Sequence, residues 1–115
     1  MGIQVLHRET LEVTRQTLGD VHPDTLTSIN NLGSLLQSQG KLSEAEPLLR
    51  EALEASRQNL GDGHPNTLAS ISNLGSLLQD QGKLSEAEPL LREALEGSRL
   101  TSINNLGSLL QSQGK

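Results

Sequence analysis

Apolar residues recur along this chain at intervals of three and four, the spacing of one face of an α-helix. One such stripe follows His22-Pro23, and a proline suits the first turn of a helix, where no N–H is needed. A second stripe follows Ser43, which has the spacing of a capping box with Glu46. The stripes comprise Leu26, Ile29, Leu32 and Leu36, then Ala45, Leu49, Ala52 and Leu53. We therefore predict pairs of helices, here called helix A and helix B.

The pattern repeats almost verbatim after 42 residues. Residues 39–54 return as residues 81–96, and residues 3–19 match residues 45–61. Residues 101–115 repeat residues 27–41 without a change. Such self-similarity is the signature of a repeat architecture. We predict a single all-α repeat domain over residues 1–115, divided into helix B of a partial repeat (3–19), two repeats (22–61 and 64–99) and helix A of a partial repeat (100–115).

Composition narrows the classes of function. The chain has a net charge of -5 and contains no cysteine, phenylalanine, tyrosine or tryptophan. An acidic chain is poorly suited to nucleic acid or to an anionic membrane surface. It shows no signal-peptide pattern and no apolar run long enough to span a membrane. We expect a cytoplasmic protein whose core is built from leucine, isoleucine and alanine.

The repeat resembles the tetratricopeptide repeat (TPR). Helix A carries Leu-Gly between large apolar residues and helix B carries small, large and small residues, at Ile29, Leu32, Gly33 and Leu36, then Ala45, Leu49 and Ala52. The period is longer than the usual 34 residues, and this variant is similar to the repeats of kinesin light chain. The resemblance implies a TPR-like solenoid, an all-α stack of antiparallel helix pairs in a right-handed superhelix. It also implies a non-catalytic scaffold for protein–protein interaction.

In this family helix A lines the concave wall, so the resemblance implies a peptide-binding face there. Asparagine and glutamine amides can both donate to and accept from an extended peptide backbone. The alternative is that these amides are solvated, or that they fix the contacts between helices A. The candidate peptide-binding residues are Asn30, Asn31, Ser34, Gln37, Ser72, Asn73, Ser76, Gln79, Asn104, Asn105, Ser108 and Gln111.

Other chemistry is weakly supported. His22 and His64 lie a full repeat apart with no second ligand nearby, so they suit helix starts better than a metal site. His7 falls at a packing position. The serines lack a neighbouring base. We therefore expect no catalytic residue, no metal and no cofactor, and we interpret the Glu and Arg residues of helix B as a solvated charged face with i, i+4 pairs such as Glu46–Arg50.

The third copy is spaced differently from the others. Arg99 matches Arg57, but Leu100 matches Leu68, so the ten residues equivalent to 58–67 are missing. Either the loop is disordered and missing from this sequence, or it has been deleted. If it has been deleted, we predict one long helix from about 85 to 113, with Gly97 as the only weak point.

The last part of a fused helix could not fold back on the helix before it. Its apolar face would therefore be uncovered, as would that of the first helix, which has no helix A of its own. We therefore predict a homo-oligomer formed through the first and last helices, by domain swapping or head-to-tail contact. This is the alternative function: an engineered or excised piece of a repeat protein whose main property is self-assembly. The candidate self-association residues are Leu6, Leu11, Ile103, Leu106 and Leu110.

Overall fold

The computed structural model describes the backbone of residues 2–113, and the side chains of this range except those of residues 3, 4 and 101–113. Within this range the chain is helical, with turns and no strand. The helices are α1 (Gly2–Leu18), α2 (Pro23–Ser38), α3 (Leu42–Leu60), α4 (Pro65–Asp80) and α5 (Leu84–Gln113). The prediction of an all-α helical repeat is confirmed.

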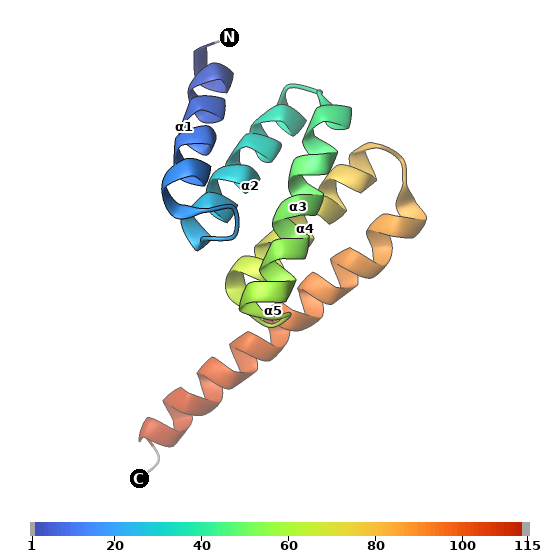
Figure 1. Ribbon diagram of the computed structural model, residues 1–115. Helices are drawn as coiled ribbons and strands as arrows, with labels where there is room; N and C mark the ends of the chain where they lie inside the picture. Colours follow the sequence, from blue (N-terminus) through green and yellow to red (C-terminus); the bar gives the residue numbers. More distant parts are fainter. Residues whose placement is uncertain (1, 114–115) are drawn as a thin grey trace.

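Each helix packs on the next one along the chain (Figure 1). In addition α2 packs on α4, so the two helices A lie side by side, while α1, α3 and the first part of α5 are the helices B of the stack. The sequence order is therefore B, A, B, A, B. Among the described helices α5 packs on α4 alone.

Helices α2 and α4 begin as the sequence predicts. His22 and His64 are their N-cap residues, and each is followed by a proline in the first turn. The Nδ1 atom of His22 accepts a hydrogen bond from the backbone N–H of Asp24 at 3.1 Å, and Nδ1 of His64 accepts one from Asn66 at 3.0 Å. These bonds satisfy backbone donors that have no partner within the helix. The histidines therefore act in starting helices.

The predicted capping box at Ser43 is wrong. Helix α3 begins at Leu42, its N-cap is Lys41, and no side chain caps it. Ser43 consequently lies inside the first turn rather than before it. Glu46 instead accepts hydrogen bonds from Arg50 Nε at 2.8 Å and Lys83 Nζ at 3.2 Å. The Glu46 carboxylate is therefore bound by the side chains of Arg50 and Lys83 and does not form a capping box with Ser43.

Leucine and alanine fill the core between the helices. A close approach of α2 to α3 depends on Gly33, because a Cβ atom there would lie 2.5 Å from Cδ2 and 2.8 Å from Cγ of Leu49. Gly75 and Leu91 repeat this contact between α4 and α5. The buried apolar residues are Leu11, Leu26, Ile29, Leu32, Leu36, Ala45, Leu49, Ala52, Leu53, Leu68, Ile71, Leu74, Leu77, Leu78, Ala87 and Ala94.

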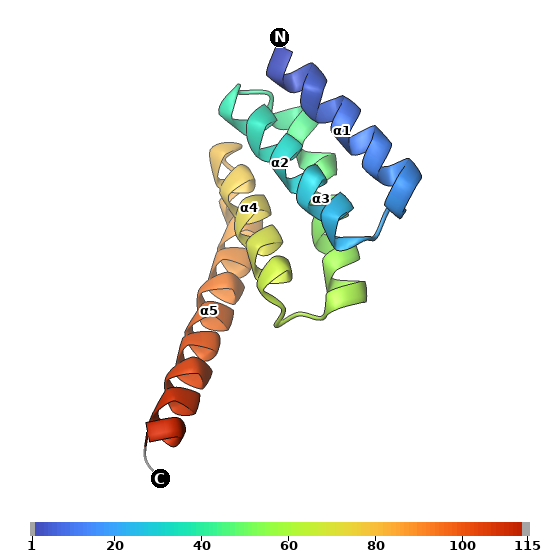
Figure 2. The same ribbon diagram turned by 90° about the vertical axis from the view of Figure 1, so that its left-hand side faces the viewer.

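The predicted fused helix is confirmed. Arg99 and Leu100 are consecutive residues of α5, which runs unbroken through 30 residues. Gly97 does not interrupt it, and a Cβ atom at this position would collide with Leu68 of α4. Figures 1 and 2 both show the second half of α5 projecting beyond the other four helices. The residues that would turn the chain back are absent from the sequence itself.

Candidate functional site

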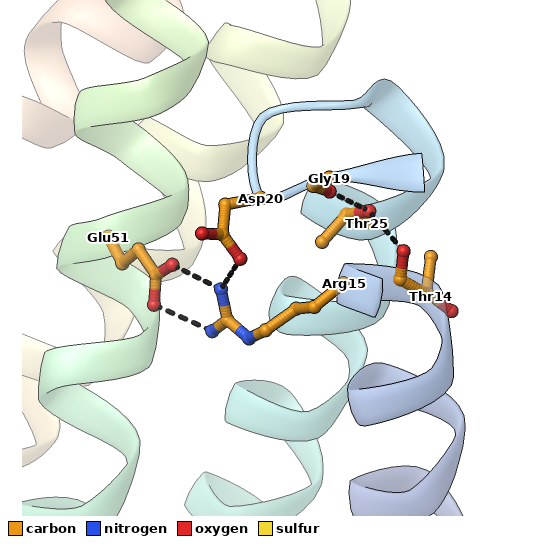
Figure 3. Close-up of polar contacts among 6 residues, drawn as sticks. All are labelled: Thr14, Arg15, Gly19, Asp20, Thr25 and Glu51. Carbon is orange, nitrogen blue, oxygen red and sulfur yellow. Dashed lines mark hydrogen bonds and ion pairs between the residues drawn. The ribbon is translucent and has the colours of Figure 1, made fainter. Parts of the chain in front are cut away.

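Successive helices B are joined by arginine–glutamate pairs that the sequence analysis did not predict. Arg15 of α1 donates from Nη1 and Nη2 to both carboxylate oxygens of Glu51 of α3, at 2.7 and 2.9 Å, and also to Asp20 at 3.0 Å (Figure 3). Arg57 repeats this arrangement toward Glu93, at 2.6 and 2.8 Å. Two-point pairing of this kind fixes orientation as well as distance. The charged face is therefore part of the stacking.

Arginine side chains lower the pKa of two of the helix B carboxyl groups, Glu46 and Glu93. The hydrogen bond from Arg50 is the main cause that lowers the pKa of Glu46 to about 2, with further hydrogen bonds from Gln81 and Lys83. The hydrogen bond from Arg57 likewise lowers the pKa of Glu93. Each carboxylate is stabilised in its charged form by a donor on its own or a neighbouring helix. The structure therefore binds these protons less tightly than an unfolded chain does.

Several polar side chains of helices A form hydrogen bonds with one another. The amide of Asn30 on α2 donates to Ser70 Oγ on α4 at 2.9 Å, and Asn73 donates to Asn30 Oδ1 at 3.4 Å. Gln37 donates to Ser76 Oγ at 3.2 Å and to Asp80 Oδ2 at 2.8 Å. Several of the predicted peptide-binding amides thus connect α2 to α4. For these residues the structural alternative considered from the sequence has direct support.

A hollow of about 230 Å³ lies on this helix A face between α2 and α4. Among its lining residues are Asn30, Asn31, Asn66 and Asn73, with Ser56 of α3. The Ser56 side chain is fully buried, and its Oγ atom has no hydrogen-bond partner. An unpartnered buried hydroxyl costs free energy. The described asparagines of helix A gather around this hollow, and it is the candidate peptide site.

The other predicted peptide-binding positions fall into three groups. Ser72 and Gln79 are exposed on α4. Ser34 and Ser76 are half-buried. The side chains of Asn104, Asn105, Ser108 and Gln111 lie outside the described ones. The structure brings Asn30, Asn31 and Asn73 together around one hollow, whereas Gln79 lines a different groove.

That second groove lies along α5. Leu11, Leu53 and Leu95 occupy the same position in three successive helices B, yet they are 6%, 8% and 70% exposed. Helix α2 packs on α1 and α4 packs on α3, but no described helix packs on α5 in that way. The result is a groove of about 470 Å³ lined by residues that include Gln79, Leu84, Leu91 and Leu95. In a complete repeat stack the next helix A would fill this groove.

The structure separates the predicted self-association residues. Leu6 is 61% exposed. Leu11 is not available on the surface, because α2 covers it within the same chain, and we therefore withdraw it from this set. The side chains of Ile103, Leu106 and Leu110 lie outside the described ones. Sequence reasoning missed Leu95, although its exposure follows from the fused helix.

Among the described residues no group of three or more His, Asp or Glu side chains is arranged to hold a metal ion. Nor is any described helix long and apolar enough to cross a membrane.

Comparison with known proteins agrees with this architecture. The family model for the tetratricopeptide repeat matches residues 4–58 and 29–100. A crystal structure of a putative kinesin light chain from Podosopora anserina with nearly identical TPR-like repeats superposes with a TM-score of 0.79, at 28% identity, over 96% of this chain and 57% of that one. A second crystal structure of that protein, which carries one substitution, gives a TM-score of 0.78 at 26% identity over 96% and 57%.

A third structure, BtubC (BKLC) from P. vanneervenii, has a TM-score of 0.77 at 20% identity over 96% of this chain and 48% of that chain, and shows likeness of fold alone. The present chain spans about half the length of these proteins. No curated protein sequence matches it.

Helix pairs that stack by repetition, with a polar helix A face, define the class of helical-repeat scaffold proteins. Within that class, the chain belongs to the tetratricopeptide repeat family. Its repeats are similar to those of the putative kinesin light chain from Podosopora anserina. Repeats of this family generally mediate protein–protein interaction and are typically not enzymes.

Proposed function

We propose that the chain is a non-catalytic scaffold that binds an extended peptide segment of another protein on its helix A face. The observation that carries this proposal is the hollow between α2 and α4, which is lined by Asn30, Asn31, Asn66 and Asn73. A peptide backbone offers both donors and acceptors, so it can pair with the side-chain amides that line this hollow.

Two kinds of asparagine line this hollow. Asn30 and Asn73 are tied into the contact between α2 and α4, so they hold the two helices A at a fixed separation. Asn31 and Asn66 are exposed at the same hollow. We assign the direct contacts with peptide to this second pair, and a positioning role to the first.

The test is selection of binders from a displayed random peptide library, followed by measurement of their affinity. Asn31→Ala is expected to weaken a selected peptide about tenfold, which corresponds to the loss of about 1.4 kcal/mol. Ala69→Arg would fill the hollow and is expected to abolish binding, since Ala69 lines it and is exposed. Gln58→Ala, an exposed change on α3, is the matched control. Unchanged affinity in the first two variants would place the peptide elsewhere.

A second function, self-association, is favoured by a separate observation. Leu95 is 70% exposed at the position where Leu53 is 8% exposed, so α5 presents an apolar face that the repeat normally covers. We propose that this face is covered by another copy of the chain. Light scattering after gel filtration at micromolar concentration tests this, and a monomer mass would exclude it.

A further inference from the structure

The groove along α5 lies at the position that the next helix A of the repeat stack would occupy. Its lining residues Leu84, Leu91 and Leu95 are the repeat equivalents of Leu42, Leu49 and Leu53 on α3. On α3, which packs on both α2 and α4, these positions are covered: Leu53 is buried, and Leu49 is buried with Gly33 of α2 as one of its neighbours. The α3–α4 contact within the chain is therefore a template for what the groove along α5 accepts.

The chain carries a segment with the required sequence. Residues 101–115 are identical to residues 27–41, which form most of helix A in the first repeat. In this chain the segment continues straight on from the helix B to which it should return. The connection that turns α3 into α4 spans residues 61–64, and its equivalent is missing before Leu100. A continuous helix cannot pack against itself, so the segment cannot enter its own groove.

Resting on the self-association proposed above, we propose that two copies exchange their last helical segments reciprocally. Residues 100–113 of each copy lie in the α5 groove of the other, and the two α5 helices run antiparallel. Each copy supplies one helix A and receives one, so the assembly closes as a dimer about a twofold axis and leaves neither α5 groove empty.

The position of the axis follows from the intact repeat. Arg57 lies in the last turn of α3 and Leu68 in the first turn of α4, so they occupy the same level of an antiparallel pair. Their equivalents are Arg99 and Leu100, which are neighbours in α5. Exchange therefore places Arg99 of one copy beside Leu100 of the other, and the twofold axis passes through this junction.

Polar residues at the edge of the groove also suit the exchanged segment. Gln37 donates to Ser76 and Asp80 of the next helix A. Its equivalent, Gln79, is exposed at the edge of the groove. The serines of the exchanged segment at the equivalent positions, Ser108 and Ser112, give Gln79 the same kind of acceptor. The segment itself carries no charged residue between 101 and 113, so it buries no charge on entering an apolar groove.

The head-to-tail alternative fits less well. There the segment would pack on the α1 positions equivalent to Leu49 and Ala52, which are His7 and Thr10. Thr10 is exposed and His7 is half-buried. A polar face is a poor receiver for the stripe of helix A that packs on leucine and alanine elsewhere in the chain. Reciprocal exchange uses the apolar groove instead.

The decisive experiment restores the missing turn. The sequence of residues 58–67 is inserted between Arg99 and Leu100, and mass is measured by light scattering without any peptide present. The unaltered chain, of 12.3 kDa, is expected at twice this mass, and the insertion variant at the monomer mass, because its third helix A can return to its own groove. A monomeric unaltered chain, a dimeric insertion variant, or a mass that grows without limit on concentration would each overturn the proposal.

Substitutions on the surface give an independent reading. Leu95→Glu is expected to convert the dimer to monomer, while Leu6→Glu, which changes an exposed leucine on α1, leaves it unchanged. Neither change touches the core of the chain, and circular dichroism confirms that each variant is folded. Loss of the dimer in Leu6→Glu with retention in Leu95→Glu would point to head-to-tail contact and overturn the reciprocal arrangement.

A cysteine placed near the axis tests the symmetry itself, since the chain has none of its own. Arg99→Cys is expected to form a disulfide between two copies under mild oxidation. Arg92→Cys is the matched control, because Arg92 lines the same groove about two helical turns away from the axis. Its two copies in the dimer would stand roughly 20 Å apart at about 1.5 Å per residue along the helices. Equal cross-linking of both variants would contradict the placement of the axis.

Discussion

At the scale of single residues, the arginines of helix B form one kind of ion pair that the sequence predicts and another kind that it does not. The pattern predicts Glu46–Arg50 within one helix, and this pair is present at 2.8 Å. It does not reveal that Arg15 reaches Glu51, or that Arg57 reaches Glu93, because the two residues of each pair are 36 positions apart in the sequence and lie on different helices. The equal spacing is a signal that comparison of the two repeats could have found. That the two side chains are close enough to pair follows only from how successive helices B are arranged in the stack.

Protonation of these carboxylates should weaken the stack. Glu46 and Glu93 have pKa values below the ordinary value near 4.5, so their contribution to stability is complete above that pH and is lost as the pH falls toward 2. Urea unfolding followed by circular dichroism should show a midpoint that decreases over this range. In Glu46→Gln the decrease should be smaller, and an identical pH profile would contradict the assignment.

The contact of Gly33 with Leu49 gives a second prediction at this scale. Gly33→Ala gains up to about 1 kcal/mol of helix propensity, but its methyl group meets the branch point of a fully buried leucine, and overpacking costs about 1–3 kcal/mol. We expect a net decrease of about 1 kcal/mol in the free energy of unfolding. Gly63→Ala, where no atom lies within 4 Å of the added methyl group, should change it by less than about 0.5 kcal/mol.

At the scale of elements, the sequence predicts most of the helices but not all of their ends. The start of α2 follows from His22-Pro23 because proline fixes φ near its helical value. The start of α3 was misplaced because Ser43 has the right spacing from Glu46, while the chain already turns helical at Leu42 after Gly40, whose φ is +79°. The fused α5 was predictable, since nothing between Arg99 and Leu100 breaks a helix.

The histidine cap belongs to this scale and can be tested by exchange of the capping group. His22→Ala removes the acceptor for the Asp24 N–H and should decrease the free energy of unfolding by about 1 kcal/mol. His22→Asn restores a side-chain acceptor at the N-cap and should recover most of the loss. Equal stability of the alanine and asparagine variants would show that Nδ1 is not the stabilising group.

At the scale of the whole molecule, each helix is supported by its neighbours in the stack, so the end of the stack decides how the chain behaves. The peptide-site residues Asn30 and Asn73 were identified by type from the sequence, but their mutual hydrogen bond depends on how α2 lies against α4. Likewise the groove on α5 follows from the missing turn, whereas Leu95 emerges as its exposed centre only once α2 and α4 are seen to cover Leu11 and Leu53.

Amide hydrogen exchange tests this dependence on neighbours. The backbone N–H groups of residues 100–113 belong to the second half of α5, which projects beyond the other helices (Figures 1 and 2), so they should exchange quickly in a single copy. At concentrations where the proposed dimer forms they should become protected, while α3 is protected at every concentration. Protection of residues 100–113 that does not change on dilution would contradict exchange between copies.

The Arg99–Leu100 junction has a consequence for how such arrays diversify. Because the repeats are nearly identical, the same short in-frame loss at another boundary, such as Arg57 to Leu68, would straighten that boundary as well. A deletion of this kind replaces a helix–turn–helix by one continuous helix. The displaced helix A is then free to pack on another copy of the chain, and no side chain of the core has changed.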